Sequence, residues 1–203
     1  MKTKAIARIA GVLVCTSLAV SAQSVDATFI NVNPGSTVAG SFNGGGSWVT
    51  LNSGIMNFDI GDAFCADPTQ TIFAGETVHY TIQPNTALPN SASIAKVVGG
   101  YLASGQTALD AAGAQWAIWE IMGDGVSNPS FSSGSVRIQN SWSSNVAARG
   151  MDYLCNLSKL PTANIIYATD SKRQDMVFTS VPEVSGSVLG ALGGIVLLFR
   201  RRR

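Results

Sequence analysis

Gln115 is the residue of this chain whose type and setting point most directly to chemistry. It lies in the segment AQWAIWE, residues 114–120, where helical spacing places it on a stripe of alanine, isoleucine, tryptophan and methionine side chains. The spacing predicts that the carboxamide faces the protein core rather than water. Burying a carboxamide without a partner costs about 1 to 3 kcal/mol, so another group must satisfy it.

Cys65 is the second residue of interest, because its segment stands out together with that of Gln115. It lies in the tetrapeptide FCAD, residues 64–67, directly after an expected strand and fifty positions before Gln115. The two segments resemble the Cys-Gln thioester domains of bacterial surface adhesins, in which a cysteine after a strand condenses with a glutamine in an Ala/Thr-Gln-x-Ala-Ile-Trp helix. The threonine that is frequent before the glutamine in this family is Ala114 here, and the resemblance extends over about residues 40–180.

The resemblance implies an internal thioester. Cys65 would be the nucleophile and Gln115 the acyl donor, so that the thiolate attacks the carboxamide carbon and ammonia leaves. The aromatic neighbours Phe64, Trp116 and Trp119 would exclude water and protect the bond. An external amine that reaches the bond would become covalently attached, which is a mode of adhesion rather than enzymatic turnover.

Two other states of these residues stay open. The two cysteines of a secreted chain form a disulfide by default, which would join Cys65 to Cys155. Otherwise both cysteines would be free thiols, and Gln115 would be a core carboxamide hydrogen-bonded to the backbone. The disulfide would indicate a non-reactive structural matrix protein.

Enzyme and metal motifs are weak by comparison. The single histidine, His79, lies on the solvent-facing side of a strand pattern with no nucleophile motif beside it, which argues against a hydrolytic triad. Asp59, Asp62 and Asp67 do not follow the order of a calcium-binding loop and are expected to form a solvated acidic turn. We therefore expect no catalytic residue, no metal and no cofactor.

The elements that would position Cys65 and Gln115 follow from the hydrophobic period along the chain. Runs of β-branched and aromatic residues between Gly, Asn, Ser and Pro clusters predict strands, and alanine-rich runs with helical spacing predict helices. The glycines at 44–46 predict a hairpin turn. The combination predicts an α+β fold, an antiparallel β-sandwich or barrel with a helical insertion. The expected strands are 28–32, 47–51, 56–60, 70–73, 77–82, 164–168 and 176–180, and the expected helices are 91–103, 108–122 and 144–157.

Residues 1–22 form a segment apart from this domain. They combine three basic residues with an apolar run at residues 9–20 and small side chains up to Ala22. This composition indicates a secretory signal peptide that is cut after Ala22. The apolar run is too short to span a membrane as a helix.

The last segment, residues 181–203, resembles the PEP-CTERM sorting tag of Gram-negative bacteria, which the membrane transpeptidase exosortase recognises and processes. The family's second proline is Val184 here. The resemblance implies that residues 184–199 anchor the chain transiently in the membrane with the arginines on the cytoplasmic side. An ordinary tail anchor would share this topology and retain the helix. The motif residues are Val181, Pro182, Glu183, Arg200, Arg201, Arg202 and Arg203.

The domain between the two ends, residues 23–180, has eleven carboxylates and six basic residues, a net charge of −5. It lacks the clustered basic residues that nucleic-acid binding needs. The two resemblances together imply a secreted, exosortase-sorted protein of the cell surface or extracellular matrix that adheres to an extracellular polymer or an amine-bearing ligand. A carbohydrate-binding β-sandwich, with Trp48 and Trp142 as stacking residues, is a third hypothesis.

Overall fold

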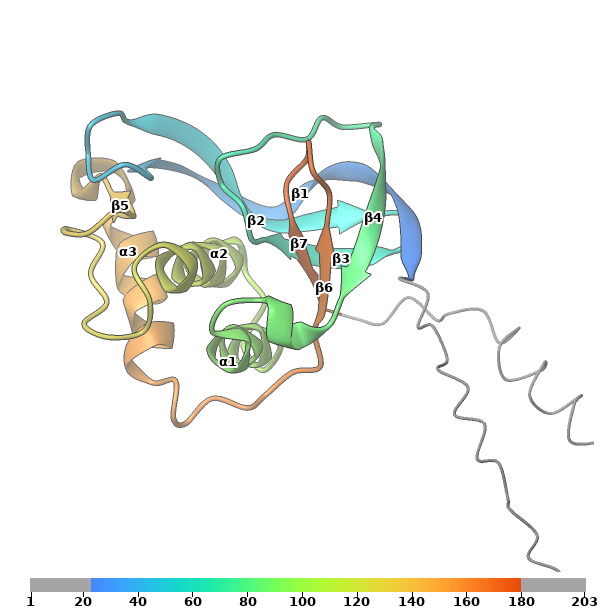
Figure 1. The fold of residues 1–203 in the computed structure, drawn as a ribbon. Coiled ribbons are helices and arrows are strands. Elements are labelled where there is room, and N and C mark those ends of the chain that lie inside the picture. Colours follow the sequence, from blue (N-terminus) through green and yellow to red (C-terminus); the bar gives the residue numbers. More distant parts are fainter. Residues whose placement is uncertain (1–22, 180–203) are drawn as a thin grey trace, which may run out of the picture.

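Seven antiparallel strands form one sheet in the computed structural model of the chain, which describes residues 23–179 apart from the side chains of residues 140–142. Their order is β2-β3-β7-β6-β4-β1-β5, and β1 also pairs with β2, so six of the strands form a closed ring of pairings. The three α-helices gather on one side of the strands (Figure 1). The expected α+β class, with an antiparallel sheet and a helical insertion, is confirmed. The strands are β1 (Ser24–Ser41), β2 (Val49–Phe58), β3 (Gly61–Cys65), β4 (Thr77–Gln83), β5 (Arg137–Ile138), β6 (Ile166–Thr169) and β7 (Met176–Phe178).

The long strand β1 pairs with three other strands, and its last two residues, Gly40 and Ser41, lie against β5. Its first part, residues 24–28, lies against β4, and its later part, from Phe29 to Gly40, lies against β2. The expected hairpin turn is confirmed between β1 and β2, where Gly44 and Gly45 have φ angles of 72° and 88° that favour glycine. The two strands expected at 47–51 and 56–60 are one continuous strand in the structure.

The prediction of a strand at Gln70–Phe73 is wrong, because this segment pairs with no other strand and forms a loop. Its β-branched residues suggested a strand, but Ile72 is buried by packing onto the core rather than by strand pairing. The short strands β3 and β5 were not expected as separate elements. The three expected helices are present as α1 (Ser91–Leu102), α2 (Ala108–Gly123) and α3 (Asn140–Cys155), and a short 3-10 helix, η1 (Asn85–Ala87), precedes α1.

Helix α2 is the element around which the others pack. Every residue from Asp110 to Ile121 is buried, so the helix contacts protein on all sides. It begins with a capping box, in which Thr107 Oγ1 accepts from the Asp110 N–H and the Asp110 carboxylate accepts from the Thr107 N–H. Asp110 also accepts from Arg149 Nε at 2.8 Å, which joins the start of α2 to α3.

The opposite end of α2 holds the loop that follows it. Glu120 is 1% exposed, and its Oε1 accepts from the Ser130 N–H at 2.8 Å. Burial raises the pKa of this carboxyl to about 7. The loop and both ends of the helix are thereby fixed, which sets the position of the side chains in the middle of α2.

Gly40 on β1 allows α2 to approach the sheet closely. A Cβ at this position would lie 2.0 Å from the ring of Trp116 and 2.8 Å from the carbonyl oxygen of Arg137. We expect Gly40→Ala to lower the free energy of unfolding of the mature protein by about 1 to 3 kcal/mol, because the ring and the strand must move apart.

Denaturant unfolding of the variant checks this expectation. Gly46→Ala is the matched control, since a Cβ there meets only the Asn43 side chain at 3.4 Å. The control should stay within about 0.5 kcal/mol of the natural protein. Equal stability of the two variants would contradict the close approach of α2 to β1.

Candidate functional site

Cys65 and Gln115 lie against each other in the core. Cys65 is the last residue of β3 and Gln115 lies in the middle of α2, and each is 1% exposed. The Cys65 N–H donates to Gln115 Oε1 at 2.9 Å, and Gln115 Nε2 donates to the Cys65 carbonyl oxygen at 2.8 Å. Gln115 is therefore buried, as its helical spacing predicts, and the partner that its burial requires is the backbone of Cys65.

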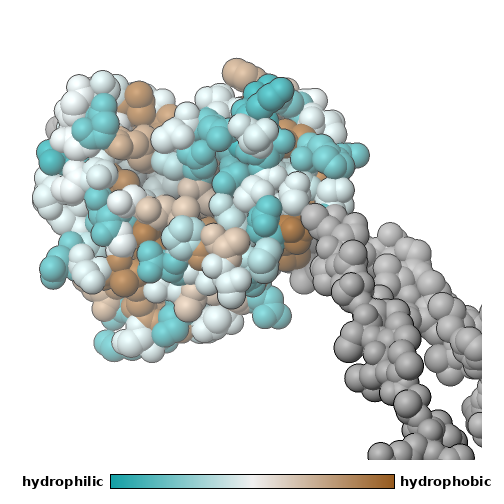
Figure 2. Space-filling view, in the orientation of Figure 1, coloured by the Kyte–Doolittle hydropathy of each residue, from teal (hydrophilic) through white to brown (hydrophobic). Residues whose placement is uncertain are grey.

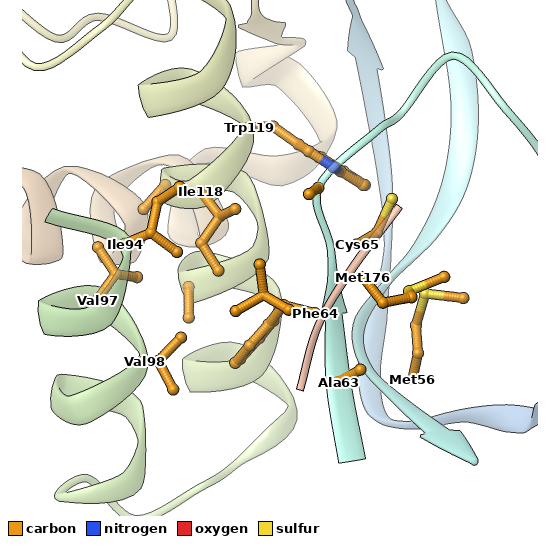
Figure 3. Packing of buried hydrophobic residues seen from close by; sticks show 14 of the residues in the cluster. Met56, Ala63, Phe64, Cys65, Ile94, Val97, Val98, Ile118, Trp119 and Met176 are labelled. Atoms are coloured by element: carbon orange, nitrogen blue, oxygen red, sulfur yellow. The ribbon is translucent and has the colours of Figure 1, made fainter. Parts of the chain in front are cut away.

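Strand β3 holds the Cys65 backbone in place for this contact. Cys65 pairs with Met176 of β7, and the next residue, Ala66, donates its N–H to the Asp175 carbonyl oxygen at 2.7 Å. Successive side chains of a strand point to opposite faces. Figure 3 shows this alternation, with Phe64 directed toward the apolar residues of α1 and Cys65 directed away from them. The strand thus fixes the direction of the thiol as well as the position of the backbone.

The two hydrogen bonds to the Cys65 backbone fix the orientation of the Gln115 carboxamide. Gln115 Oε1, the acceptor, is the oxygen that would gain negative charge if a nucleophile attacked the carboxamide carbon. An N–H already directed at such an oxygen is the arrangement by which oxyanion sites stabilise acyl transfer. The arrangement therefore satisfies a buried polar side chain, and it would stabilise negative charge on Oε1 if a nucleophile attacked the carboxamide.

The Cys65 thiol is held in its neutral form. Its Sγ donates to the carbonyl oxygen of Asp67 at 3.1 Å. Burial raises the pKa of the thiol to about 12 and outweighs the effect of the Trp119 indole, which favours the anion. At neutral pH the sulfur is therefore protonated, and it becomes a nucleophile only when its proton is removed.

A cavity of about 240 Å³ borders this pair of residues. Apolar side chains form much of its wall, and its polar groups are neutral amides and hydroxyls. Two buried polar atoms of the wall, Gln70 Oε1 and Trp119 Nε1, have no hydrogen-bond partner among the described residues. The wall is formed by Phe29, Val32, Leu51, Asn52, Ser53, Gly54, Met56, Cys65, Pro68, Gln70, Thr71, Ile72, Gln115, Trp119 and Gln174.

Most polar residues of this wall were not predicted. Gln70 and Thr71 belong to the segment that was expected to be a strand, and Gln174 precedes β7. Their sequence spacing relative to Cys65 gives no signal, because loops bring them to the cavity. Trp119 is the exception, since it lies one helical turn after Gln115.

The cysteines do not pair in the structure. Cys65 and Cys155 are both free thiols, the first buried and the second exposed at the C-terminal end of α3. Helix α2 packs between α3 and the sheet that contains Cys65 (Figure 1). Among the described residues, the Gln115 carboxamide is therefore in contact with the Cys65 backbone, and there is no Cys65–Cys155 disulfide.

The other residues that the sequence singled out have local roles. His79 is exposed, as expected, and its Nδ1 lies 2.6 Å from Asp26 Oδ1. Asp59 accepts from the Thr28 N–H, and Asp62 accepts from Asn57 Nδ2. Within residues 23–179, no group of three His, Cys, Asp or Glu side chains is arranged to hold a metal ion.

The surface bears on the carbohydrate hypothesis only through Trp48, which is 47% exposed near the β1–β2 turn. The side chain of Trp142 lies outside those described. On the face shown in Figure 2, hydrophobic residues are interspersed with hydrophilic ones.

The predicted signal peptide at 1–22 and the predicted sorting segment at 181–203 lie outside the described residues. Between them, none of the helices is both long enough and apolar enough to cross a bilayer.

Comparison of the chain with protein-family models, with curated proteins and with solved structures gives no match. The chemistry of the site is therefore argued from its own geometry.

The different settings of the two thiols predict different reactivity. In the folded mature protein at neutral pH, a small alkylating reagent should modify Cys155 and leave Cys65 unmodified, because Cys65 is buried and protonated. Peptide mass mapping after a short pulse of reagent measures this. Modification of Cys65 at the rate of Cys155 would contradict the buried position of the thiol.

Proposed function

We propose that this chain is a secreted, exosortase-sorted protein of the cell surface or extracellular matrix that adheres covalently through a thioester between Cys65 and Gln115. The observation that carries the proposal is the buried contact in which the backbone of Cys65 holds both ends of the Gln115 carboxamide. The sequence separation of the two residues makes such a contact a product of the fold rather than of local geometry.

Formation of the bond would start from this contact, with the Cys65 sulfur turning from the Asp67 carbonyl oxygen toward the Gln115 carboxamide. The Cys65 sulfur gives up its proton and attacks the Gln115 carbonyl carbon, and the Cys65 N–H supports the charge on Oε1. The carbon–nitrogen bond then breaks, and nitrogen leaves as ammonia with the thiol proton. The packing of α2 against β3 would limit the motion of the two reacting groups, and this restriction favours a reaction between them.

Burial would preserve the bond once it has formed. Both residues are almost fully shielded from solvent, which limits hydrolysis. The raised pKa of the Cys65 thiol also makes its thiolate a poor leaving group. The adjacent cavity would still admit a small amine, whose nitrogen attacks the carbonyl carbon, releases the thiol and leaves an amide at Gln115.

A non-reactive structural protein is the alternative, and one observation favours it. Both ends of the Gln115 carboxamide are already bonded to the Cys65 backbone, an arrangement that would by itself join α2 to β3 without any reaction. Formation of the thioester would remove the Nε2 donor and with it one of these two bonds. Chemistry on the purified protein distinguishes the two functions.

The thioester predicts a defined mass and a defined reaction. The mature protein should be lighter than its sequence mass by one ammonia, and incubation with methylamine should add one methylamine as an amide at Gln115, which leaves the product heavier than the sequence mass by one methylene group. Intact mass spectrometry followed by peptide mapping measures both changes. Cys65→Ala and Gln115→Ala should each have full mass and take up no methylamine.

Cys155→Ala is the matched control, because it removes the exposed thiol and should react like the natural protein. A natural protein of full mass that takes up no amine would overturn the adhesion proposal. A mass two hydrogens low, with linked Cys65 and Cys155 peptides, would replace it with the disulfide-bonded matrix protein.

Sorting is tested independently on protein from the native host. The mature chain should begin at Gln23 and should lack the Arg200–Arg203 cluster, because the exosortase is expected to remove the end of the tag. Terminal peptide mapping measures both ends. A released protein that retains all four arginines would contradict exosortase processing and leave the thioester question unaffected.

A further inference from the structure

Trp119 carries an unused hydrogen-bond donor at the site. Its side chain is 5% exposed, and its Nε1–H has no acceptor in hydrogen-bond geometry among the described residues. A buried donor without a partner is costly and calls for a physical explanation. Trp119 lines the same cavity as Cys65 and Gln115, so the donor belongs to the surroundings of the reacting groups.

Trp116 shows what an ordinary indole does in the same helix. Its Nε1 donates to Ser53 Oγ at 3.0 Å, and the residue is fully buried. The two rings contact each other edge to face, with centroids 5.1 Å apart. Two neighbouring tryptophans therefore share their packing but differ in whether the N–H is paired.

The Cys65 sulfur is the candidate acceptor for the Trp119 N–H, because the two side chains line the same cavity. In Figure 3 the indole of Trp119 lies next to the Cys65 side chain, and both residues line the same cavity. The indole N–H favours the anionic form of this sulfur and lowers the thiol pKa, against the larger effect of burial. In the structure the neutral thiol donates its hydrogen to the Asp67 carbonyl oxygen, and the Trp119 N–H is not in hydrogen-bond geometry with the sulfur.

We propose that the Trp119 N–H stabilises the Cys65 thiolate whenever the sulfur becomes anionic, both when the thioester forms and when an amine displaces it. This inference rests on the proposed thioester and names a catalytic residue for it. A donor that has no partner in the ground state and bonds to the charged sulfur stabilises only the charged species, so it speeds the reaction.

The electron balance of the displacement places the donor where charge appears. The amine lone pair forms a bond to the Gln115 carbonyl carbon, and the carbon–sulfur bond breaks with its electron pair on sulfur. The Trp119 N–H stabilises this negative charge until a proton from the attacking amine is transferred to the sulfur. The products are an amide at Gln115 and the neutral Cys65 thiol.

The test compares Trp119→Phe with Trp116→Phe. Trp119→Phe keeps an aromatic ring and removes the idle donor, and it should slow methylamine uptake by about 10- to 100-fold. Trp116→Phe removes a donor that Ser53 uses, so it should lower stability without slowing the reaction comparably. Equal slowing in the two variants would overturn the role of Trp119.

A second measurement does not depend on the thioester. In a Gln115→Ala, Cys155→Ala background, Cys65 is the one thiol of the mature protein, and its alkylation rate at mildly alkaline pH reports how readily it ionises. Trp119→Phe should slow alkylation by about tenfold. Loosening of the fold would instead speed it, so the sign of the change separates the two effects.

A variant with β-(3-benzothienyl)alanine at position 119 removes only the N–H and keeps the shape of the indole. It should slow alkylation as Trp119→Phe does, and it decides the question if the phenylalanine variant does not fold. Unchanged or faster alkylation would overturn the inference. If the natural protein forms no thioester, the adhesion proposal fails by mass, while the alkylation rates still decide whether Trp119 stabilises the thiolate.

Discussion

The pairing of the Gln115 carboxamide with the Cys65 backbone is the interaction on which the rest of the structure depends. It joins the centre of a fully buried helix to the end of a short strand through two hydrogen bonds. A carboxamide in such a position is shielded from water. Losing its bond to either the Cys65 N–H or the Cys65 carbonyl oxygen would therefore leave a buried polar group unsatisfied. The helix and the strand therefore have to meet in one register.

The surrounding architecture meets this requirement with small residues and fixed ends. Alanines and Gly113 allow α2 to be buried on every side, and a Cβ on Gly113 would lie 2.7 Å from the Arg149 side chain of α3. The capping box at Thr107 and the Glu120 contact hold the two ends of the helix. Strand β7 holds Cys65 from the other side. Rigid elements thus position Cys65 and Gln115, which would suit the proposed reaction, because it occurs once rather than repeatedly.

Sequence reasoning predicted the parts of this site that follow local periodicity. The burial of Gln115 and the outward position of His79 follow from helical and strand spacing, and the structure confirms both. The identity of the Gln115 partner could not be derived from spacing, because a contact across fifty residues depends on how β3 packs against α2. The segment 70–73 failed for a related reason, since β-branched composition cannot distinguish a strand from a loop packed over a cavity.

The central claim is that the sulfur of Cys65 and the carbonyl carbon of Gln115 are covalently joined in the mature protein. A high-resolution crystal structure of protein purified without added amines measures the distance between these two atoms directly. The account predicts continuous density at covalent distance and no nitrogen on the Gln115 side chain. Separate side chains at van der Waals distance, with the intact carboxamide still bonded to the Cys65 backbone, would contradict it.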